Sequence, residues 1–352
     1  MKIVVLGGGI SSERHVALVT ATSACQALRR KGHQAVFVDL FFGMENYDKP
    51  FDQAFLEPDG LCGNVKIETK APDLDAVRRS RLYAGSGIIG TGINGICSLA
   101  DCVFLGLHGR DGEDGKIQAL LEMLGVPYTG SGPLASAIAM NKPVAKRLLR
   151  AEGIRTPEWQ ELTVTEDDIE RLAATLPVPC VVKVVDGGSS LGVEQPDTRE
   201  ELASALRKVL PFGSRLMVEQ KIIGREMTVP VLDGRALSPI EIIPPDGEFD
   251  YVAKYQSGEH GAKEICPAAL TPEEDRMLRE AAAKVHRDLD LRVYSRSDFI
   301  LDKQGRAWFL EVNTLPGMTP NSLIPKAAAV EGISYDDLVE QIIRLSLNEK
   351  RR

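Results

Sequence analysis

The sequence predicts an α/β protein in which an N-terminal unit with a parallel sheet is followed by two units that mix strands and helices. Three observations favour this fold class. An apolar strand, a helix and a second apolar strand follow one another over residues 2–40, which is the βαβ unit of a parallel sheet. A further apolar strand at 101–107 ends in a glycine-rich polar loop, and a hairpin at 294–313 comes late in the chain. At 352 residues, the chain is long enough for two or three domains.

The composition is that of an ordinary globular protein, with 43% hydrophobic and 26% charged residues. The net charge of −8 argues against a nucleic-acid binder, which normally carries a basic surface. The six cysteines include no C-x-x-C pair, which favours reduced, buried thiols over disulfides or a zinc site. The first apolar run, residues 3–6, is too short for a signal sequence, and no run approaches the ~18 apolar residues of a membrane span. We therefore expect a cytoplasmic protein with no membrane partner.

The glycine-rich turn after the first strand has two interpretations. The motif GGGISS at residues 7–12 approaches a dinucleotide-binding fingerprint, but Ser12 stands where a third glycine would pack the helix on the strand. Asp39 could bind a ribose, although it lies ~30 residues on, where ~20 is usual. A nicotinamide oxidoreductase built on residues 1–40 is thus one alternative. In the following helix, Glu13 is either a first-turn acid favoured by the helix dipole or a functional residue.

The strand at 101–107 leads into a loop, residues 108–115, that contains three glycines and four charged residues. A helix is expected at 116–124. Loops at the carboxyl ends of parallel strands bind ligands in open α/β sheets, so His108 is either structural or part of a site. The earlier segment 43–86 is irregular and contains several prolines and glycines. We interpret it as an insertion or a surface excursion and assign no function to it.

The middle of the chain carries candidate phosphate-binding residues. A helix expected near 135–152 contains Lys142, and a strand at 179–185 contains Lys183 in an apolar run. Backbone N–H groups of the Gly/Ser loop at 186–192 could hold phosphate oxygens beside Lys183, with a plain turn as the alternative. The loop is not a Walker A motif, because the G-K-[ST] ending is absent.

Glu219 ends a predicted strand at 216–219, where an acid beside backbone amides could hold an adenine or a ribose. After residues 220–224, a second strand is expected at 225–231. The predicted domains are 1–135, 136–219 and 220–352.

The late hairpin is the most informative stretch. If its tight loop is at residues 304–305, Asp298 lies opposite Glu311 and Arg296 lies opposite Asn313, all on one face, because strand side chains alternate. Two facing carboxylates repel each other unless a cation lies between them. Carboxylate and amide oxygens suit Mg²⁺, which usually shares its coordination shell with substrate phosphates. The alternative is a solvated face with incidental acids.

Together these stretches resemble the D-alanine–D-alanine ligase family of the ATP-grasp superfamily, over nearly the whole chain outside 43–86. The two main motifs are HGRDGEDGKIQALLE (108–122) and SRSDFILDKQGRAWFLEVNTLPGMTPNSL (295–323). The supporting segments are SSERHVAL (11–18), MNKPVAKRLL (140–149), VVKVVDGGSSLG (181–192) and DYVAKY (250–255). The resemblance implies an ATP-grasp fold, with an N-terminal α/β domain followed by two α+β subdomains that enclose the nucleotide.

The resemblance also implies a role for each matching residue. Two Mg²⁺ ions, with Mn²⁺ able to replace them, would be held by Asp298, Glu311 and Asn313. The residues implied in ATP binding are Lys142, Lys183, Ser189, Ser190, Glu219, Ile222, Glu226, Lys254 and Asn313. The first D-alanine would contact Glu13 and His108, and the second Arg296, Gly317, Ser322 and Leu323. The residues implied in catalysis are Glu13, Ser189, Lys254, Tyr255 and Arg296, with residues 249–264 as a lid.

The implied reaction joins two D-alanines through an acyl phosphate, for peptidoglycan precursors, with release of ADP and phosphate. The Lys254–Tyr255 pair favours D-alanine as the second substrate over D-lactate or D-serine. A homodimer without nucleic-acid partners is expected from the resemblance. An ATP-binding sensor without turnover is a further alternative, which would need neither His108 nor Arg296.

Overall fold

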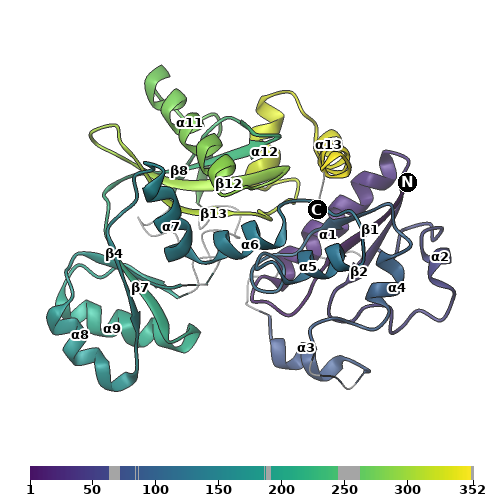
Figure 1. The fold of residues 1–352 in the computed structure, drawn as a ribbon, viewed down its shortest axis with the longest axis horizontal. Helices are drawn as coiled ribbons and strands as arrows, with labels where there is room; N and C mark the ends of the chain where they lie inside the picture. Colours follow the sequence, from purple (N-terminus) through teal and green to yellow (C-terminus); the bar gives the residue numbers. More distant parts are fainter. Residues whose placement is uncertain are drawn as a thin grey trace.

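The computed structural model describes residues 1–62, 72–83, 85, 87–185, 187, 192–244 and 262–349. Within these residues the chain forms one parallel and two antiparallel sheets, with helices packed on them (Figure 1). The predicted α/β class, with a parallel N-terminal unit followed by mixed units, is confirmed. None of the described helices is long and apolar enough to cross a membrane.

The N-terminal unit is a three-stranded parallel sheet in the order β2-β1-β3. Its strands are β1 (Lys2–Gly7), β2 (Gln34–Asp39) and β3 (Cys102–Leu105). The central strand is buried on both faces, as its unbroken apolar run predicts. Helix α1 (Arg14–Arg30) packs closely on this sheet. A Cβ at Gly7 would lie 2.3 Å from Cβ of Ala21, so glycine is what permits the close approach of helix and strand.

The segment predicted as a surface insertion is partly buried. Its described helices are α2 (Phe51–Ala54) and α3 (Leu74–Ser80), and α4 (Ile93–Cys97) follows. Met44, Ala54 and Phe55 lie in the same core as the parallel sheet. Of the two interpretations, the surface excursion is therefore wrong, because these apolar side chains complete the core of the N-terminal unit.

The second unit is a four-stranded antiparallel sheet with its own core. Its strands, in sheet order, are β4 (Trp159–Thr163), β7 (Arg215–Gln220), β5 (Cys180–Val184) and β6 (Val193–Glu194). Helices α8 (Ile169–Thr175) and α9 (Arg199–Val209) cover one face of this sheet (Figure 1). The strands predicted to carry Lys183 and Glu219 are β5 and β7, which pair directly.

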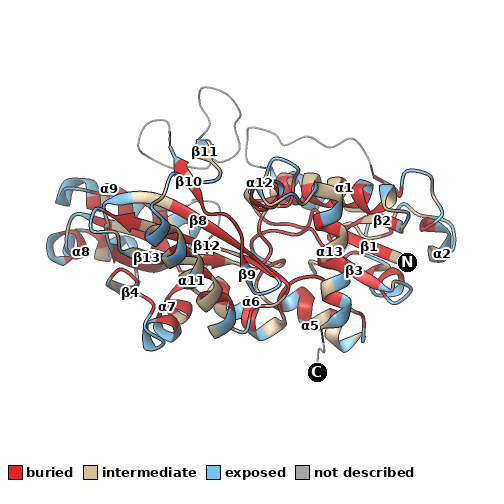
Figure 2. Cartoon of the chain, turned by 90° about the horizontal axis from the view of Figure 1, so that it is seen from above, coloured by how far each residue is buried: buried red, intermediate tan, exposed pale blue. Residues whose placement is uncertain are grey.

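The third unit is a sheet of six strands in the order β11-β10-β8-β12-β13, with β9 paired to β8. The strands are β8 (Gly224–Leu232), β9 (Arg235–Ala236), β10 (Ile240–Ile243), β11 (Lys263–Ile265), β12 (Tyr294–Asp302) and β13 (Ala307–Asn313). Its helices are α6 (Pro133–Met140), α7 (Lys142–Ala151) and α11 (Pro272–Asp288), and α5 (Lys116–Met123) precedes α6. Figure 2 shows that β8 and β12 are buried along most of their length.

The single helix predicted near 135–152 is two helices. Asn141 separates them and its side chain accepts a hydrogen bond from the N–H of Val144 at 3.2 Å. Pro143 stands in the first turn of the second helix, where a missing N–H costs nothing, whereas within a continuous helix it would remove a hydrogen bond. An asparagine cap and a proline in the first turn are start signals that explain the break.

The hairpin β12–β13 has the predicted register at the site. Arg296 pairs with Asn313 and Asp298 with Glu311. Nearer the loop, however, the register is shifted by one residue, and the connection runs over 303–305. A bulge at Leu310 restores the predicted pairing. The predicted pairing is therefore confirmed, but the two-residue loop from which it was predicted is wrong.

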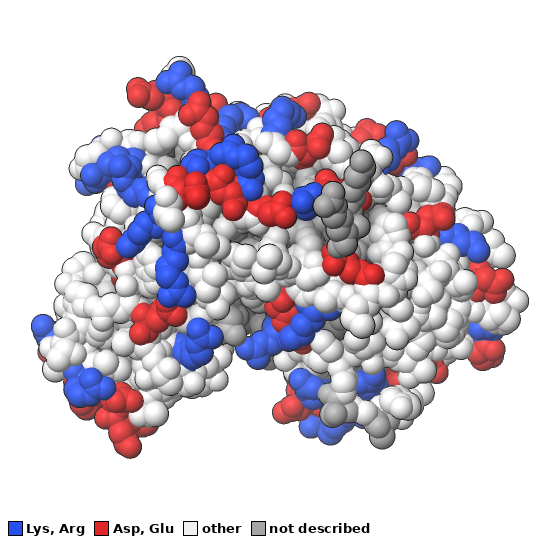
Figure 3. All heavy atoms as spheres, in the orientation of Figure 1, with Lys and Arg blue, Asp and Glu red and all other residues white. Residues whose placement is uncertain are grey.

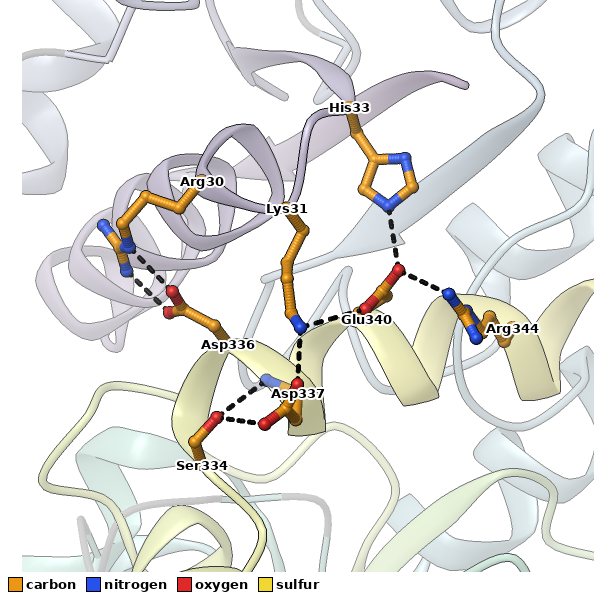
Figure 4. Close-up of polar contacts among 8 residues, drawn as sticks. All are labelled: Arg30, Lys31, His33, Ser334, Asp336, Asp337, Glu340 and Arg344. Atoms are coloured by element: carbon orange, nitrogen blue, oxygen red, sulfur yellow. Dashed lines mark hydrogen bonds and ion pairs between the residues drawn. The ribbon is translucent and has the colours of Figure 1, made fainter.

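Of the last two helices, α12 (Leu323–Val330) packs beside β8, and α13 (Tyr335–Asn348) returns to the N-terminal unit. Four apolar residues of α13 share the core of the parallel sheet, and these are Leu338, Val339, Ile342 and Ile343. At the surface, α13 and the C-terminal end of α1 are joined by ion pairs (Figure 4), among them Arg30–Asp336 at 2.7 Å and Lys31–Asp337 at 2.5 Å.

We expect the apolar contact of α13 to contribute far more to stability than its ion pairs. Ile342→Ala should lower the free energy of unfolding by ~2–5 kcal/mol, because Ile342 is fully buried and a cavity remains. Asp336→Asn should cost less than ~1 kcal/mol, because its ion pair with Arg30 is exposed. Urea unfolding of both variants measures the difference, and equal losses would contradict it.

Candidate functional site

A cleft of about 980 Å³, its open mouth included, lies between the four-stranded and six-stranded sheets. The face of the molecule in Figure 3 is hollowed between the lobe of the four-stranded sheet and the N-terminal lobe, with acidic and basic side chains along the hollow. Of the residues predicted to bind ATP or metal, those lining the cleft are Lys142, Lys183, Glu219, Ile222, Glu226, Asp298 and Glu311. Apolar side chains, including Val181, Ile300 and Leu310, complete its walls.

The floor of the cleft is a buried cluster of lysines and carboxylates. The Glu219 carboxylate, 2% exposed, forms ion pairs with Lys183 on the neighbouring strand and with Lys146 on α7. Burial lowers the pKa of Lys183 to about 7, and it also holds the pKa of Lys146 well below its ordinary value. A polyanion in the cleft would oppose this shift and keep the lysines protonated.

Lys146 is assigned no part in a site by the sequence analysis. It lies one helical turn after Lys142, so α7 directs both ammonium groups toward the cleft. A lysine on an otherwise amphipathic helix is usually solvent-exposed, and only the burial of Lys146 against Glu219 distinguishes it.

Asp298 is the centre of the predicted metal site. Its carboxylate accepts hydrogen bonds from the Thr228 hydroxyl at 2.5 Å, from two nitrogens of Arg296 at 3.0 and 2.9 Å, and from Nδ2 of Asn313 at 3.3 Å. Glu311, opposite Asp298, lies 3.4 Å from Nζ of Lys142. Oxygen donors from Asp, Glu and Asn on one sheet face suit Mg²⁺. Among the residues that the structure describes, no three His, Cys, Asp or Glu side chains come together as a metal-binding group, so the metal would rely on these two carboxylates, the Asn313 amide and oxygens of its ligand.

A second cavity adjoins the first and shares part of its lining. Its residues include Glu13, Gly109, Glu113 and Asn313. Lys142, Gly187 and Glu311 line both cavities, and the Lys142 ammonium donates to the Gly187 carbonyl between them. A group bound in one cavity therefore meets a group bound in the other beside the Lys142–Glu311 pair. Glu13, which sequence reasoning left open, lies at this second cavity.

His108 has both ring nitrogens engaged within the protein. Nδ1 lies 2.8 Å from the Leu315 carbonyl and Nε2 lies 2.9 Å from the Thr20 hydroxyl. A carbonyl only accepts, so Nδ1 carries the proton, and Nε2 accepts from Thr20. Burial lowers the pKa of His108 and so favours this neutral form. The His108 side chain thus joins its own loop, after β3, to α1 and to the loop after β13, both beside the second cavity. These contacts indicate that His108, which was predicted to contact the substrate, positions the loops.

Glu113 joins the loop after β3 to the loop after β13, and the sequence alone does not single it out. One oxygen accepts from the N–H of Gly109 at 2.9 Å, and the other from the N–H of Leu315 at 3.0 Å. Burial, together with the nearby charge of Glu13, raises the pKa of Glu113 to about 7. In the sequence, Glu113 is one of four charges in a loop, and only the fold shows that it is buried.

The loop after β13 holds the residues predicted around the second amino acid. Ser322 accepts at Oγ from the N–H of Thr319 at 3.1 Å, and its side chain lies close to Gly317. Leu323 begins α12 directly afterwards. None of these residues belongs to the described lining of either cavity. Met318, in the same loop, donates from its N–H to the hydroxyl of Thr20 at 3.4 Å. Ser189, Ser190, Lys254 and Tyr255 lie outside the described residues.

Comparison with known proteins agrees with this geometry. The sequence matches the family models for D-ala D-ala ligase N-terminus, over residues 2–131, and D-ala D-ala ligase C-terminus, over 148–344. It is 38% identical over 343 residues to a D-alanine–D-alanine ligase of Lacticaseibacillus casei, with 97% of this chain and 95% of that one covered. Two solved structures are similar. One is the D-alanine–D-alanine ligase from Bacillus anthracis complexed with ATP (30% identity, TM-score 0.69, 99% and 97% covered). The other is the VanG D-Ala:D-Ser ligase from Enterococcus faecalis (26% identity, TM-score 0.74, 98% and 99% covered).

A parallel α/β unit followed by two sheets around a cleft lined with lysines and carboxylates defines an ATP-dependent ligase of the ATP-grasp class. More narrowly, the chain belongs to the D-alanine–D-alanine ligase family, since both family models match and together cover most of its length. The nicotinamide alternative finds no support. Asp39, its candidate ribose ligand, is buried in an ion pair with Arg14 at 2.6 Å.

Replacing Glu113 should change how stability depends on pH. A carboxyl whose pKa rises from 4.5 to about 7 on folding favours the folded state when protonated, so this contribution is full below about 4.5 and is lost as the pH rises through about 7. The unfolding free energy of Glu113→Gln, relative to the unmodified protein, should therefore increase between pH 4.5 and pH 8, by on the order of 3 kcal/mol. Urea unfolding at several pH values measures it. Glu122→Gln on α5 is the control, and a difference for Glu113→Gln that stays constant with pH would contradict the expectation.

Proposed function

We propose that this protein joins two molecules of D-alanine into D-alanyl-D-alanine, with conversion of ATP to ADP and phosphate, for peptidoglycan precursor synthesis. The observation that carries the proposal is the pair of adjoining cavities that meet at Lys142 and Glu311. One cavity is large and lined by lysines, as a nucleotide requires, and the other is smaller and contains carboxylates, as an amino acid requires. Membership of the ligase family supports the same assignment.

The reaction has two steps. A carboxylate oxygen of the first D-alanine attacks the γ-phosphorus of ATP, and the bond to the β-phosphate oxygen breaks, which gives an acyl phosphate and ADP. The amine of the second D-alanine then attacks the acyl carbon, loses a proton, and phosphate leaves. The protein contributes positioning and charge neutralisation. An acyl phosphate hydrolyses in water, so the site must also exclude solvent.

Each cavity residue has a proposed part. Lys142 and Lys183 contact phosphates, and Glu219, Ile222 and Glu226 surround the adenosine. Glu13 binds the ammonium of the first D-alanine, while His108 and Glu113 hold the loops that enclose it. Arg296 stabilises the negative charge that develops on the acyl oxygen. The residues around the second D-alanine are Gly317, Ser322 and Leu323. For the segments outside the described residues, we propose Ser189 and Ser190 over the phosphates, Lys254 at the transferred phosphoryl group and Tyr255 in the lid.

Two Mg²⁺ ions, or Mn²⁺, would be held by Asp298, Glu311 and Asn313, whose oxygens fit this metal. When bound, the metal neutralises charge on the phosphates. We further propose a cytoplasmic homodimer. The six free cysteines support a reducing compartment, and sedimentation of the purified protein tests the dimer.

We expect ADP release to require Mg²⁺ and the D-isomer of alanine, with a dipeptide identified by mass. Arg296→Ala should lower kcat by roughly 10²- to 10³-fold, the usual cost of losing a group that stabilises developing charge. Glu311→Gln should also lower activity strongly, since it removes a metal oxygen. Matched controls are Arg306→Ala on the hairpin loop and Glu241→Gln on the same sheet, both ion-paired away from the cleft. ATP binding without any ADP release would favour a sensor.

D-alanine should be the preferred second substrate. The fold alone does not decide this, because the similar VanG structure is a D-Ala:D-Ser ligase. Offering D-alanine together with an equal concentration of D-serine or D-lactate, and weighing the products by mass, tests the preference. A majority of the serine or lactate product would overturn it.

A further inference from the structure

The Asp298 carboxylate is saturated by donors from the protein. A carboxylate has about four lone-pair sites. Oδ1 accepts from the Thr228 hydroxyl at 2.5 Å and from Nε of Arg296 at 3.0 Å. Oδ2 accepts from a second nitrogen of Arg296 at 2.9 Å and from Asn313 at 3.3 Å. A metal ion can therefore bind Asp298 only if one of these donors leaves.

Arg296 is the donor best placed to leave. Thr228 is fully buried, so its hydroxyl would lose its acceptor with no solvent to replace it. Asn313 makes the longest of the four bonds and is itself a proposed metal ligand. The guanidinium makes two of the four bonds, carries a positive charge that a dication would repel, and is 16% exposed on a long side chain that can turn away.

Arg296 also lies where it can serve the second cavity. It pairs across the hairpin with Asn313, which lines that cavity. Its positive charge also acts on His108 and Glu113, which hold the loops around the proposed amino-acid site. Arg296 thus contacts the metal carboxylate and lies beside a residue of the second cavity.

We infer that Arg296 and the metal ion are alternative partners of Asp298, so that loading of the metal–nucleotide complex releases Arg296 toward the acyl group, while Thr228 holds the carboxylate in place throughout. This inference rests on the proposed function. It makes Thr228 a positioning residue for the metal site, and it makes Arg296 available for catalysis only when the nucleotide cleft is loaded.

The first test uses electron paramagnetic resonance to measure the affinity for Mn²⁺ in the presence of the β,γ-imido analogue of ATP. Arg296→Lys keeps the positive charge but cannot make the two-point contact with Asp298. It should bind Mn²⁺ roughly threefold to tenfold more tightly, because the ion then displaces a weaker partner. Arg306→Lys, at the hairpin loop, is the control and should bind as the unmodified protein does. Unchanged or weaker binding by Arg296→Lys would overturn the inference.

Thr228 supplies a second, opposite expectation. Thr228→Val removes the hydroxyl at nearly constant volume and should weaken Mn²⁺ binding, whereas Thr228→Ser keeps the hydroxyl and should restore it. The spectral linewidth of bound Mn²⁺ reports the ligand arrangement, which a general loss of stability would not change. Equal binding by the valine and serine variants would contradict the role given to Thr228.

A third measurement needs no substitution. Phenylglyoxal modifies accessible guanidinium groups, and mass spectrometry of peptides gives the rate at Arg296. The rate should rise several-fold when Mn²⁺ is added together with the β,γ-imido analogue, and a rate that does not change would overturn the exchange. Failure of the proposed function has a different signature, since the unmodified protein would then bind no Mn²⁺–nucleotide complex in the first test.

Discussion

The site depends on the pairing of β12 with its two neighbours, β8 and β13. This one arrangement places Thr228, Arg296, Asp298, Glu311 and Asn313 on adjoining positions of a single face. No local preference of these polar residues would bring them together. The apolar side chains on the opposite face, including Phe299 and Phe309, are buried in the core under the sheet, and a slip of one residue would exchange the two faces. The hydrophobic core therefore fixes the geometry of the chemistry.

The cleft shows how burial and charge oppose each other at such a site. Lys146, Lys183 and Glu219 lie in nearly dry surroundings, where unpaired charges are costly. The ion pairs among them offset part of that cost, and an anionic ligand would offset more. A protein under selection for stability alone would place apolar residues of similar volume here. The retained charges indicate that binding, and not folding, determines this part of the sequence.

The sequence predicts well what is periodic and local, and poorly what depends on burial. The parallel N-terminal sheet and the face of Asp298 follow from alternation and apolar runs. The bulge at Leu310 does not, and the correct pairing arose because a longer loop and the bulge cancel. Thr228 and Glu113 look like ordinary strand and loop residues until the fold shows them buried against Asp298 and two backbone N–H groups. The family resemblance assigns roles to more residues than the spacing of residues does, but those roles rest on sequence similarity and not on geometry.

The packing of α13 on α1 has a consequence for biosynthesis. The strands of the parallel sheet are synthesised before α13, whose Leu338, Val339 and Ile342 belong to the core of that sheet. While α13 is still missing, the apolar side chains that it covers in the folded protein remain exposed, and exposed apolar surface makes a nascent chain prone to aggregate. The core of the N-terminal unit therefore closes only after the strands of the other two sheets have been made.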